Sequence, residues 1–175
     1  HEFLPSEDDE IEHVAKAMNI SAAQVRSRAA DLAEFNPMLG MRGVRLGISM
    51  PEIYDMQARA IFQAAVSVNA QGGKPVVPEI MIPLVSAYRE VELVKERVDA
   101  IAIAIQEETG TKFDYKLGVM VETPRAALRA NDLAKSSTFL SFGTNDLTQM
   151  TYGLSRDDAG RFMRYYVNLG VFAED

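Results

Sequence analysis

The chain of 175 residues contains no cysteine and only two histidines. The lack of cysteine excludes disulfide bonds and cysteine-based catalysis by this chain, and it fits a reducing compartment. His1 is the terminal residue, and His13 falls on the polar face of a predicted helix. Neither histidine is therefore a plausible member of a catalytic triad or of a metal cluster.

Long apolar runs and an excess of positive charge are also lacking. No run of about 18 apolar residues occurs, so the sequence predicts no membrane-spanning helix. The start of the chain has no initiator methionine and no signal-peptide pattern, and we expect it to be cut from a longer protein. The formal net charge is −7, which argues against nucleic-acid binding because that function usually needs a basic face. Hydrophobic residues make up 47%, enough for the core of one domain.

Residues 6–33 are predicted to form two short helices. Ser6 with Asp9, and Ser21 with Gln24, have the spacing of capping boxes, and apolar residues follow each pair at helical intervals. Two helices joined by a tight turn could also read DNA. That alternative is weak, because the acidic residues that open the first helix would repel phosphates.

The rest of the chain alternates between predicted strands and predicted helices. Buried strands are expected at residues 76–84, 117–121 and 139–142, where the sequence is apolar. Helices are expected at residues 49–70, 86–110, 125–135 and 147–169, and an irregular segment or a short strand between turns at residues 35–47. The helix at 86–110 is predicted to begin at a Ser86 cap and to carry an apolar stripe of Val91, Val94, Val98, Ile101 and Ile105. The helix at 49–70 is predicted to bury Ile53, Met56, Ala60, Ala64 and Val68. Apolar strands between helices are typical of a parallel sheet, in either a doubly wound domain or a (β/α)₈ barrel.

Carboxylates follow two of the predicted strands. Both candidate architectures bind ligands beyond the carboxyl ends of their strands. Glu122 follows the second strand, and Asp146 closes the run Gly143-Thr144-Asn145-Asp146 after the third. Neighbouring strands lie about 5 Å apart, so both carboxylates could hold one Mg²⁺. The alternative is that Glu122 caps the next helix and Asp146 stabilises a turn.

Donors of positive charge and hydrogen bonds accompany these carboxylates. Gly143 would let backbone N–H groups approach an anion, and Thr144 and Asn145 offer side-chain donors, although an ordinary turn explains them as well. Arg42 and Arg156 carry guanidinium groups that match carboxylate or phosphate oxygens. For a single arginine, a role in surface solubility or in a helix cap is the competing interpretation.

Three segments resemble the phosphoenolpyruvate-utilising family, and they occur in the family's order. They are Asn36–Gly43 (NPMLGMRG), Val119–Arg125 (VMVETPR) and Ser141–Gln149 (SFGTNDLTQ). The opening HEFLP, Pro51–Tyr54 and Tyr152–Gly160 strengthen the resemblance, most closely to the dikinase members. The resemblance covers nearly the whole chain, and its motifs are long enough to be specific.

The resemblance implies an α/β fold that is part of a (β/α)₈ TIM-type barrel with parallel strands, preceded by a short helical pair. Residues 1–34 would be a helical insertion within the barrel domain, and residues 35–175 a partial barrel that binds phosphoenolpyruvate or pyruvate. A full barrel needs about 250 residues. The chain would therefore be incomplete and inactive alone. It also lacks the cysteine of the family's Cys-Gly-Glu motif, and its open sheet edges would favour self-association.

The resemblance also implies residue roles and partners. Glu122 and Asp146 would ligate Mg²⁺, and Gly143, Thr144, Asn145 and Asp146 would contact the substrate. Arg42 would bind the transferred phosphoryl group or the substrate oxyanion, assisted by Arg156. A phosphohistidine domain of the same longer chain would exchange a phosphoryl group with pyruvate. The full enzyme would convert ATP, phosphate and pyruvate to AMP, diphosphate and phosphoenolpyruvate, as a homodimer in the cytoplasm, or in a plastid if it comes from a plant.

Two competing functions remain open at this point. A Mg²⁺-dependent aldolase or lyase that acts through a pyruvate-like enolate would also place Glu and Asp after barrel strands. The runs Asn36–Gly43 and Gly143–Gln149 argue against it. The other alternative is a non-catalytic fragment, which would show no Mg²⁺-linked substrate binding.

Overall fold

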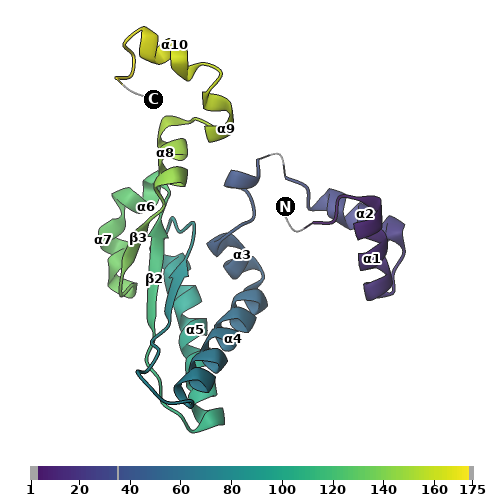
Figure 1. The fold of residues 1–175 in the computed structure, drawn as a ribbon, viewed down its shortest axis with the longest axis vertical. Coiled ribbons are helices and arrows are strands. Elements are labelled where there is room, and N and C mark those ends of the chain that lie inside the picture. Colours follow the sequence, from purple (N-terminus) through teal and green to yellow (C-terminus); the bar gives the residue numbers. More distant parts are fainter. Residues whose placement is uncertain (1–3, 35, 174–175) are drawn as a thin grey trace. The chain divides into compact units, whose positions relative to one another are not determined.

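The computed structural model of the chain describes residues 4–34 and 36–173 (Figure 1). Residues 1–3, which belong to the opening motif, and Phe35, which begins the segment expected to be irregular, lie outside this description. The chain divides into two compact units, His1–Arg42 and Gly43–Asp175. In the described part of both units, no helix has the length and apolar character needed to cross a bilayer.

The first unit contains the predicted pair of helices. They are α1 (Asp8–Met18) and α2 (Ala22–Asp31), and the 3₁₀ helix η1 (Pro37–Leu39) follows. Ile11 and Ala15 of α1 form a small core with Val25 of α2. The two helices thus cover each other's apolar stripe.

Both helices of the first unit begin with a capping box. In α2 the box is the predicted one, since the Gln24 N–H donates to the Ser21 hydroxyl at 3.2 Å and the Ser21 N–H donates to the Gln24 side chain at 2.9 Å. In α1 the prediction is wrong by one residue, because Glu7 and Glu10 form the box. The longer glutamate reaches back to accept the Ser6 N–H at 3.0 Å.

The second unit is an α/β arrangement around a three-stranded sheet (Figure 1). Its strands are β1 (Glu79–Ile82), β2 (Lys116–Val121) and β3 (Leu140–Phe142). Its longer helices are α4 (Pro51–Asn69), α5 (Tyr88–Thr109) and α8 (Thr144–Tyr152). Its shorter helical segments are α3 (Val44–Ser49), α6 (Pro124–Leu128), α7 (Ala130–Leu133), η2 (Ala134–Ser136), α9 (Arg156–Ala159) and α10 (Met163–Asn168).

The strands are parallel and lie in the order β1-β2-β3, which confirms the predicted parallel sheet. Ile82 at the end of β1 lies beside Val119 of β2, and Val121 at the end of β2 lies beside Phe142 of β3. The loops that follow the strands therefore leave from one edge of the sheet. Within the described residues the sheet has three strands, fewer than the eight of a complete (β/α)₈ barrel.

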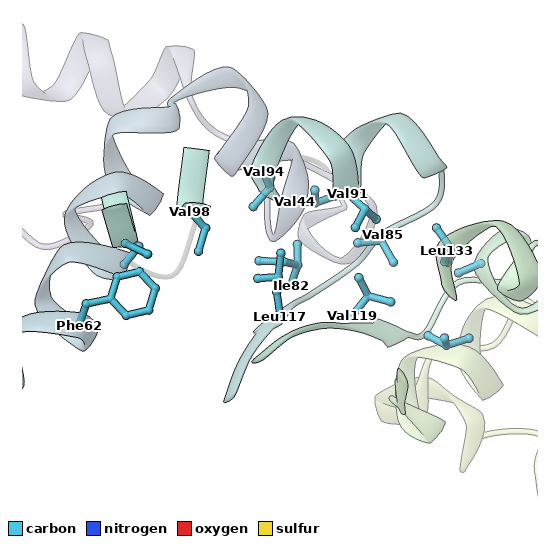
Figure 2. Close-up of a cluster of buried hydrophobic side chains, with 14 of the residues drawn as sticks. Val44, Phe62, Ile82, Val85, Val91, Val94, Val98, Leu117, Val119 and Leu133 are labelled. Carbon is cyan, nitrogen blue, oxygen red and sulfur yellow. The ribbon is translucent and has the colours of Figure 1, made fainter. Parts of the chain in front are cut away.

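The core of the second unit lies between the sheet and the helices α4 and α5 (Figure 2). Leu117, Val119 and Val121 alternate along β2 and are buried on the same face. The side chains that cover them come from α5, α4 and α3: Val91, Val94, Val98, Ala102, Ile105, Ala58, Phe62 and Val44. The stripe predicted for α5 is confirmed at Val91, Val94, Val98 and Ile105, whereas Ile101 is half-buried. Gly110 follows the last residue of α5, and its φ of 63° suits glycine.

The buried face of α4 differs from the predicted one. Ala58, Phe62 and Ala65 are buried, whereas Met56 is 62% exposed and Val68 48%. Phe62 is completely buried, and its ring packs against the aromatic rings that precede β2, with centroids 5.1 and 4.8 Å apart. The helix therefore buries the side that carries Phe62, and not the predicted side.

Other element boundaries also differ from the predictions. The segment expected to be irregular contains α3, which starts where the Val44 N–H donates to the Pro83 carbonyl at 3.0 Å. The strand expected at residues 76–84 covers only Glu79–Ile82, because Pro78 and Pro83 flank it and proline has no N–H for the sheet. Short pieces also replace the helices expected at residues 125–135 and 147–169.

Ser86 does not cap α5 as predicted. Ala87 occupies the N-cap position of α5, and Glu90 reaches back from the first turn. Its carboxylate accepts the Ser86 N–H at 2.8 Å and the Ala87 N–H at 2.9 Å. The glutamate satisfies two backbone donors at once, so no serine cap is needed.

Candidate functional site

Glu122 is a buried carboxylate at the carboxyl end of the central strand. It directly follows β2 and is 8% exposed. The Leu84 N–H, in the loop after β1, donates to its Oε1 atom at 2.6 Å. Buried charges in proteins are normally paired, hydrogen-bonded or bound to a metal ion. The position of Glu122 is thus typical of a functional group more than of a surface carboxylate.

Thr123, and not Glu122, caps the helix that follows β2. The Ala126 N–H donates to the Thr123 hydroxyl oxygen at 3.1 Å, and the Thr123 hydroxyl donates to the Val85 carbonyl at 3.0 Å. Thr123 is 6% exposed, and Pro124 occupies the first turn of α6, where proline is favoured. The interpretation of Glu122 as a helix cap is therefore wrong.

Gly143 brings the end of β3 against Glu122. Its N–H donates to the Val121 carbonyl at 3.1 Å, which continues the pairing of β3 with β2. A Cβ atom at Gly143 would lie 2.5 Å from Glu122 Oε2 and 2.7 Å from Glu122 Cβ, too close for any side chain. Its φ of −85° is open to every residue. Glycine is needed here for space, and not for backbone freedom.

The run from Gly143 to Asp146 forms the start of α8. Gly143 is the residue before the helix, so Thr144, Asn145 and Asp146 make up its first turn in place of the separate turn expected from the sequence. The half-buried Asp146 lies where a helix favours negative charge. The amino end of α8 begins directly beyond the end of β3 (Figure 1). An anionic group of a ligand would be favoured at the same place.

The two arginines lie in different units. Arg156 begins α9, and its guanidinium donates to the Asn145 side-chain oxygen at 3.4 Å. The Gln149 side chain accepts the Arg156 N–H at 2.7 Å, which fixes α9 against the end of α8. Arg42 ends the first unit, where its guanidinium donates to the Met38 carbonyl at 3.3 Å. The structure therefore brings Gly143 into close packing with Glu122, and it brings Arg156 into hydrogen-bond contact with Asn145.

The donor set in the second unit fits a magnesium ion. Glu122 and Asp146 both supply carboxylate oxygens, which Mg²⁺ prefers, and they follow neighbouring parallel strands. Within the described residues, no group of three or more His, Cys, Asp or Glu could hold a metal ion. Mg²⁺ usually takes one or two carboxylates and completes its shell with water and substrate oxygens. Glu122 and Asp146 would match this number of protein ligands.

Two residues of the site are not among those predicted from the sequence. Leu84 holds Glu122 through its backbone, at a φ of 58° that leucine rarely adopts, and nothing in the sequence signals it. Thr123, by contrast, carries a signal in the sequence. Threonine before proline at the start of a helical segment is a typical cap.

The chain matches a protein family over most of its length. The family is described as PEP-utilising enzyme, PEP-binding domain, and the match covers residues 8–170. The chain is 54% identical to the pyruvate, phosphate dikinase of Rhizobium meliloti (strain 1021) and 46% identical to that of Clostridium symbiosum, each over 175 residues. It is 49% identical over 179 residues to the chloroplastic pyruvate, phosphate dikinase of Flaveria pringlei.

These relatives are much longer than the chain. All of the chain is covered in each comparison, but it spans only 18–20% of the length of these relatives. The match confirms the resemblance seen in the sequence, and it favours that family over the aldolase or lyase alternative. The chain belongs to the phosphoenolpyruvate-utilising enzymes and corresponds to their phosphoenolpyruvate-binding domain.

Proposed function

We propose that this chain is the part of a pyruvate phosphate dikinase that binds Mg²⁺ together with pyruvate or phosphoenolpyruvate. It would support phosphoryl transfer between a phosphohistidine and pyruvate. The observation that carries the proposal is the Glu122 carboxylate, which is buried at the end of the central parallel strand and held by a backbone N–H. The chain spans 20% of its bacterial relatives, so the conversion of ATP, phosphate and pyruvate would need the rest of a longer chain.

The residues at the carboxyl edge of the sheet would bind and orient the substrate. Glu122 and Asp146 would hold the ion, and Mg²⁺ would stabilise negative charge on the carboxylate and carbonyl oxygens of pyruvate. Gly143, Thr144 and Asn145 would contact the substrate carboxylate at the amino end of α8, where an anion is favoured. Fixed dipoles of this kind stabilise developing charge without having to reorganise.

The arginines would neutralise the charge of the moving phosphoryl group. Arg156 is placed beside Asn145 by the contacts at the start of α9, so it can assist substrate binding from the loop after α8. Arg42 would bind the phosphoryl group or the substrate oxyanion. Phosphoryl transfer depends mainly on positioning and charge stabilisation, and arginine forks match phosphate oxygens.

The surrounding architecture is part of the same proposal. The sheet would be completed to a (β/α)₈ barrel by other segments of the longer chain, with residues 1–34 as a helical insertion and residues 35–175 as the partial barrel. The full protein would be a homodimer, with its phosphohistidine domain on the same chain. The isolated 175-residue chain would be inactive.

The proposal can be tested by calorimetry with oxalate, a mimic of enolpyruvate, on the full-length protein. Oxalate is expected to bind only when Mg²⁺ is present. Glu122→Gln and Asp146→Asn should each abolish this binding, because each removes a charged oxygen ligand. At about 100 times its Kd, oxalate with Mg²⁺ should also stabilise the domain by roughly 2.7 kcal/mol.

Glu79→Gln is a matched control for the loss of a carboxylate. Glu79 begins β1, at the amino end of the strands and away from the proposed site, and its carboxylate pairs with Lys116 at 2.7 Å. Its substitution should leave oxalate binding unchanged. Oxalate binding that is independent of Mg²⁺, or that survives both site substitutions, would refute the proposed metal and substrate site.

A further inference from the structure

The loop after β1 contains a leucine in an unusual backbone conformation. Leu84 has a φ of 58°, and Asn19 is the other non-glycine residue with a positive φ in the described part of the chain. Asparagine tolerates this conformation, but for a leucine it is strained. Leu84 is also 1% exposed, so the strain is held inside the protein. Such strain persists where the surrounding structure determines the backbone, and it is found often at functional sites.

Contacts on both sides of Leu84 determine this backbone. The preceding carbonyl, of Pro83, accepts the Val44 N–H at 3.0 Å at the start of α3. The following carbonyl, of Val85, accepts the Thr123 hydroxyl at 3.0 Å. Gly43 lies so close that a Cβ atom there would be 2.9 Å from both Leu84 Cβ and the Pro83 oxygen. Leu84 is therefore fixed between two hydrogen bonds and a close packing contact.

These contacts fix the direction in which the Leu84 N–H points. It donates to Glu122 Oε1 at 2.6 Å, a short distance typical of a bond to a charged acceptor. The other side of the carboxylate faces Gly143, where a Cβ atom would be 2.5 Å from Oε2. The Glu122 carboxylate is thus held between a fixed donor from the loop after β1 and the backbone after β3.

We propose that Leu84 is a positioning residue, whose left-handed backbone aims its N–H at Glu122 and thereby fixes the orientation of this carboxylate for a divalent cation. The inference rests on the proposed function of Glu122 as a metal ligand. It assigns to Leu84 a backbone role, carried by the N–H, that is separate from the packing of its side chain. Partners that orient a metal ligand typically change metal affinity by about 10–100-fold when they are lost.

Replacing a backbone amide by an ester tests this role directly. In the full-length protein, the α-hydroxy analogue of leucine at position 84 removes the N–H and keeps the side chain. The matched control is the α-hydroxy analogue of alanine at position 87, which removes a backbone N–H that donates to a different glutamate carboxylate, that of Glu90, at 2.9 Å. Mn²⁺ with oxalate is the probe, measured by calorimetry, and thermal unfolding without ligands reports on the fold.

The ester at position 84 is expected to weaken Mn²⁺-dependent oxalate binding by about 10–100-fold. The ester at position 87 should bind like the unchanged protein, although both esters lower the unfolding temperature to a similar extent. Unchanged binding with the ester at position 84, or equal losses with both esters, would overturn the inference and leave the turn a structural feature only. Failure of the proposed function is distinguishable, because Glu122→Gln and Asp146→Asn would then keep Mn²⁺-dependent oxalate binding.

Discussion

Gly143 and Glu122 share a space that admits only one side chain. The glycine allows β3 to end against the carboxylate, and its own backbone conformation is ordinary. The chemistry of this corner therefore depends on steric fit at a single position. Glu122 contacts the Leu84 N–H on one side and Gly143 on the other. These contacts are local, but they bring together the residues that follow all three strands.

We expect Gly143→Ala to weaken both stability and ligand binding. The added methyl group must displace Glu122, and overpacking of this kind costs about 1–3 kcal/mol. Urea unfolding of the 175-residue chain measures the first effect, and calorimetry with oxalate and Mg²⁺ on the full-length protein measures the second. Gly160→Ala is the control, because its Cβ atom would meet nothing within 4 Å. Equal behaviour of the two variants would contradict the prediction.

Tyr115 makes the stability of the fold sensitive to alkaline pH. Burial raises the pKa of the Tyr115 hydroxyl, and its hydrogen bond to Asp99 and the charge of that carboxylate raise the pKa further. In the unfolded chain the tyrosine loses its proton at about pH 10, whereas in the folded chain it keeps it. The contribution of this tyrosine is therefore complete below about pH 10 and is lost as the pH rises further.

Tyr115→Phe should accordingly flatten the alkaline decline in the free energy of unfolding. The measurement is urea unfolding of the 175-residue chain at about pH 9 and about pH 11. Some decline should remain, because burial also raises the pKa of Tyr54. Tyr165→Phe, at a side chain that is 68% exposed, should leave the decline as it is. An undiminished decline in Tyr115→Phe would show that Asp99 and burial do not control this titration.

At the scale of elements, the junction between β2 and α6 depends on one hydroxyl group. Thr123 caps α6 and also bonds the loop after β1, so the same group orders two segments around Glu122. Thr123→Val keeps the shape but leaves a buried carbonyl and a helix N–H unpaired, and we expect a loss of about 2–4 kcal/mol. Thr123→Ser keeps the hydroxyl and should lose clearly less. Urea unfolding of the chain gives both values, and equal losses would contradict a role of the hydroxyl.

At the scale of the whole molecule, the second unit exposes the edges of its sheet. Within the described residues, β1 and β3 each pair with β2 on one side only. A groove of about 310 Å³ lies along β1. It is lined by the consecutive residues 79–83 and by α4 residues that include Tyr54 and Ile61. Consecutive strand residues point to opposite faces of the sheet, so a groove lined by all of residues 79–83 runs along the open edge of β1.

We expect the isolated 175-residue chain to self-associate as its concentration rises. Open strand edges favour pairing between chains, and Met81 in β1 is 40% exposed. Sedimentation velocity over a range of concentrations measures the association. Met81→Lys should reduce it by placing a charge on the edge, whereas Gln63→Lys adds the same charge at an exposed position of α4 and should not. A chain that stays monomeric at every concentration would contradict this prediction.

The sequence determined the order of the elements and the type of sheet. The apolar runs around Ile82, Val119 and Leu140 predicted three strands, and the helical patterns between them predicted parallel pairing. These predictions succeed because the spacing of apolar residues along the chain reflects which side chains are buried. It also placed Glu122 and the Gly143–Asp146 run at strand ends, although their chemical roles remain a prediction. Element ends were less predictable, as in β1, where the flanking prolines shorten the strand.

The tertiary structure alone decided which face of α4 is buried and how Glu122 is held. The buried face of α4 depends on Phe62 meeting the aromatic rings before β2, which lie far along the chain. The donor to Glu122 is a backbone N–H, and every residue except proline has one, so residue type carries no signal for it. The positive φ of Leu84 contradicts the local preference of leucine. Contacts from α3 and Thr123 impose it, and contacts between distant segments cannot be read from local sequence.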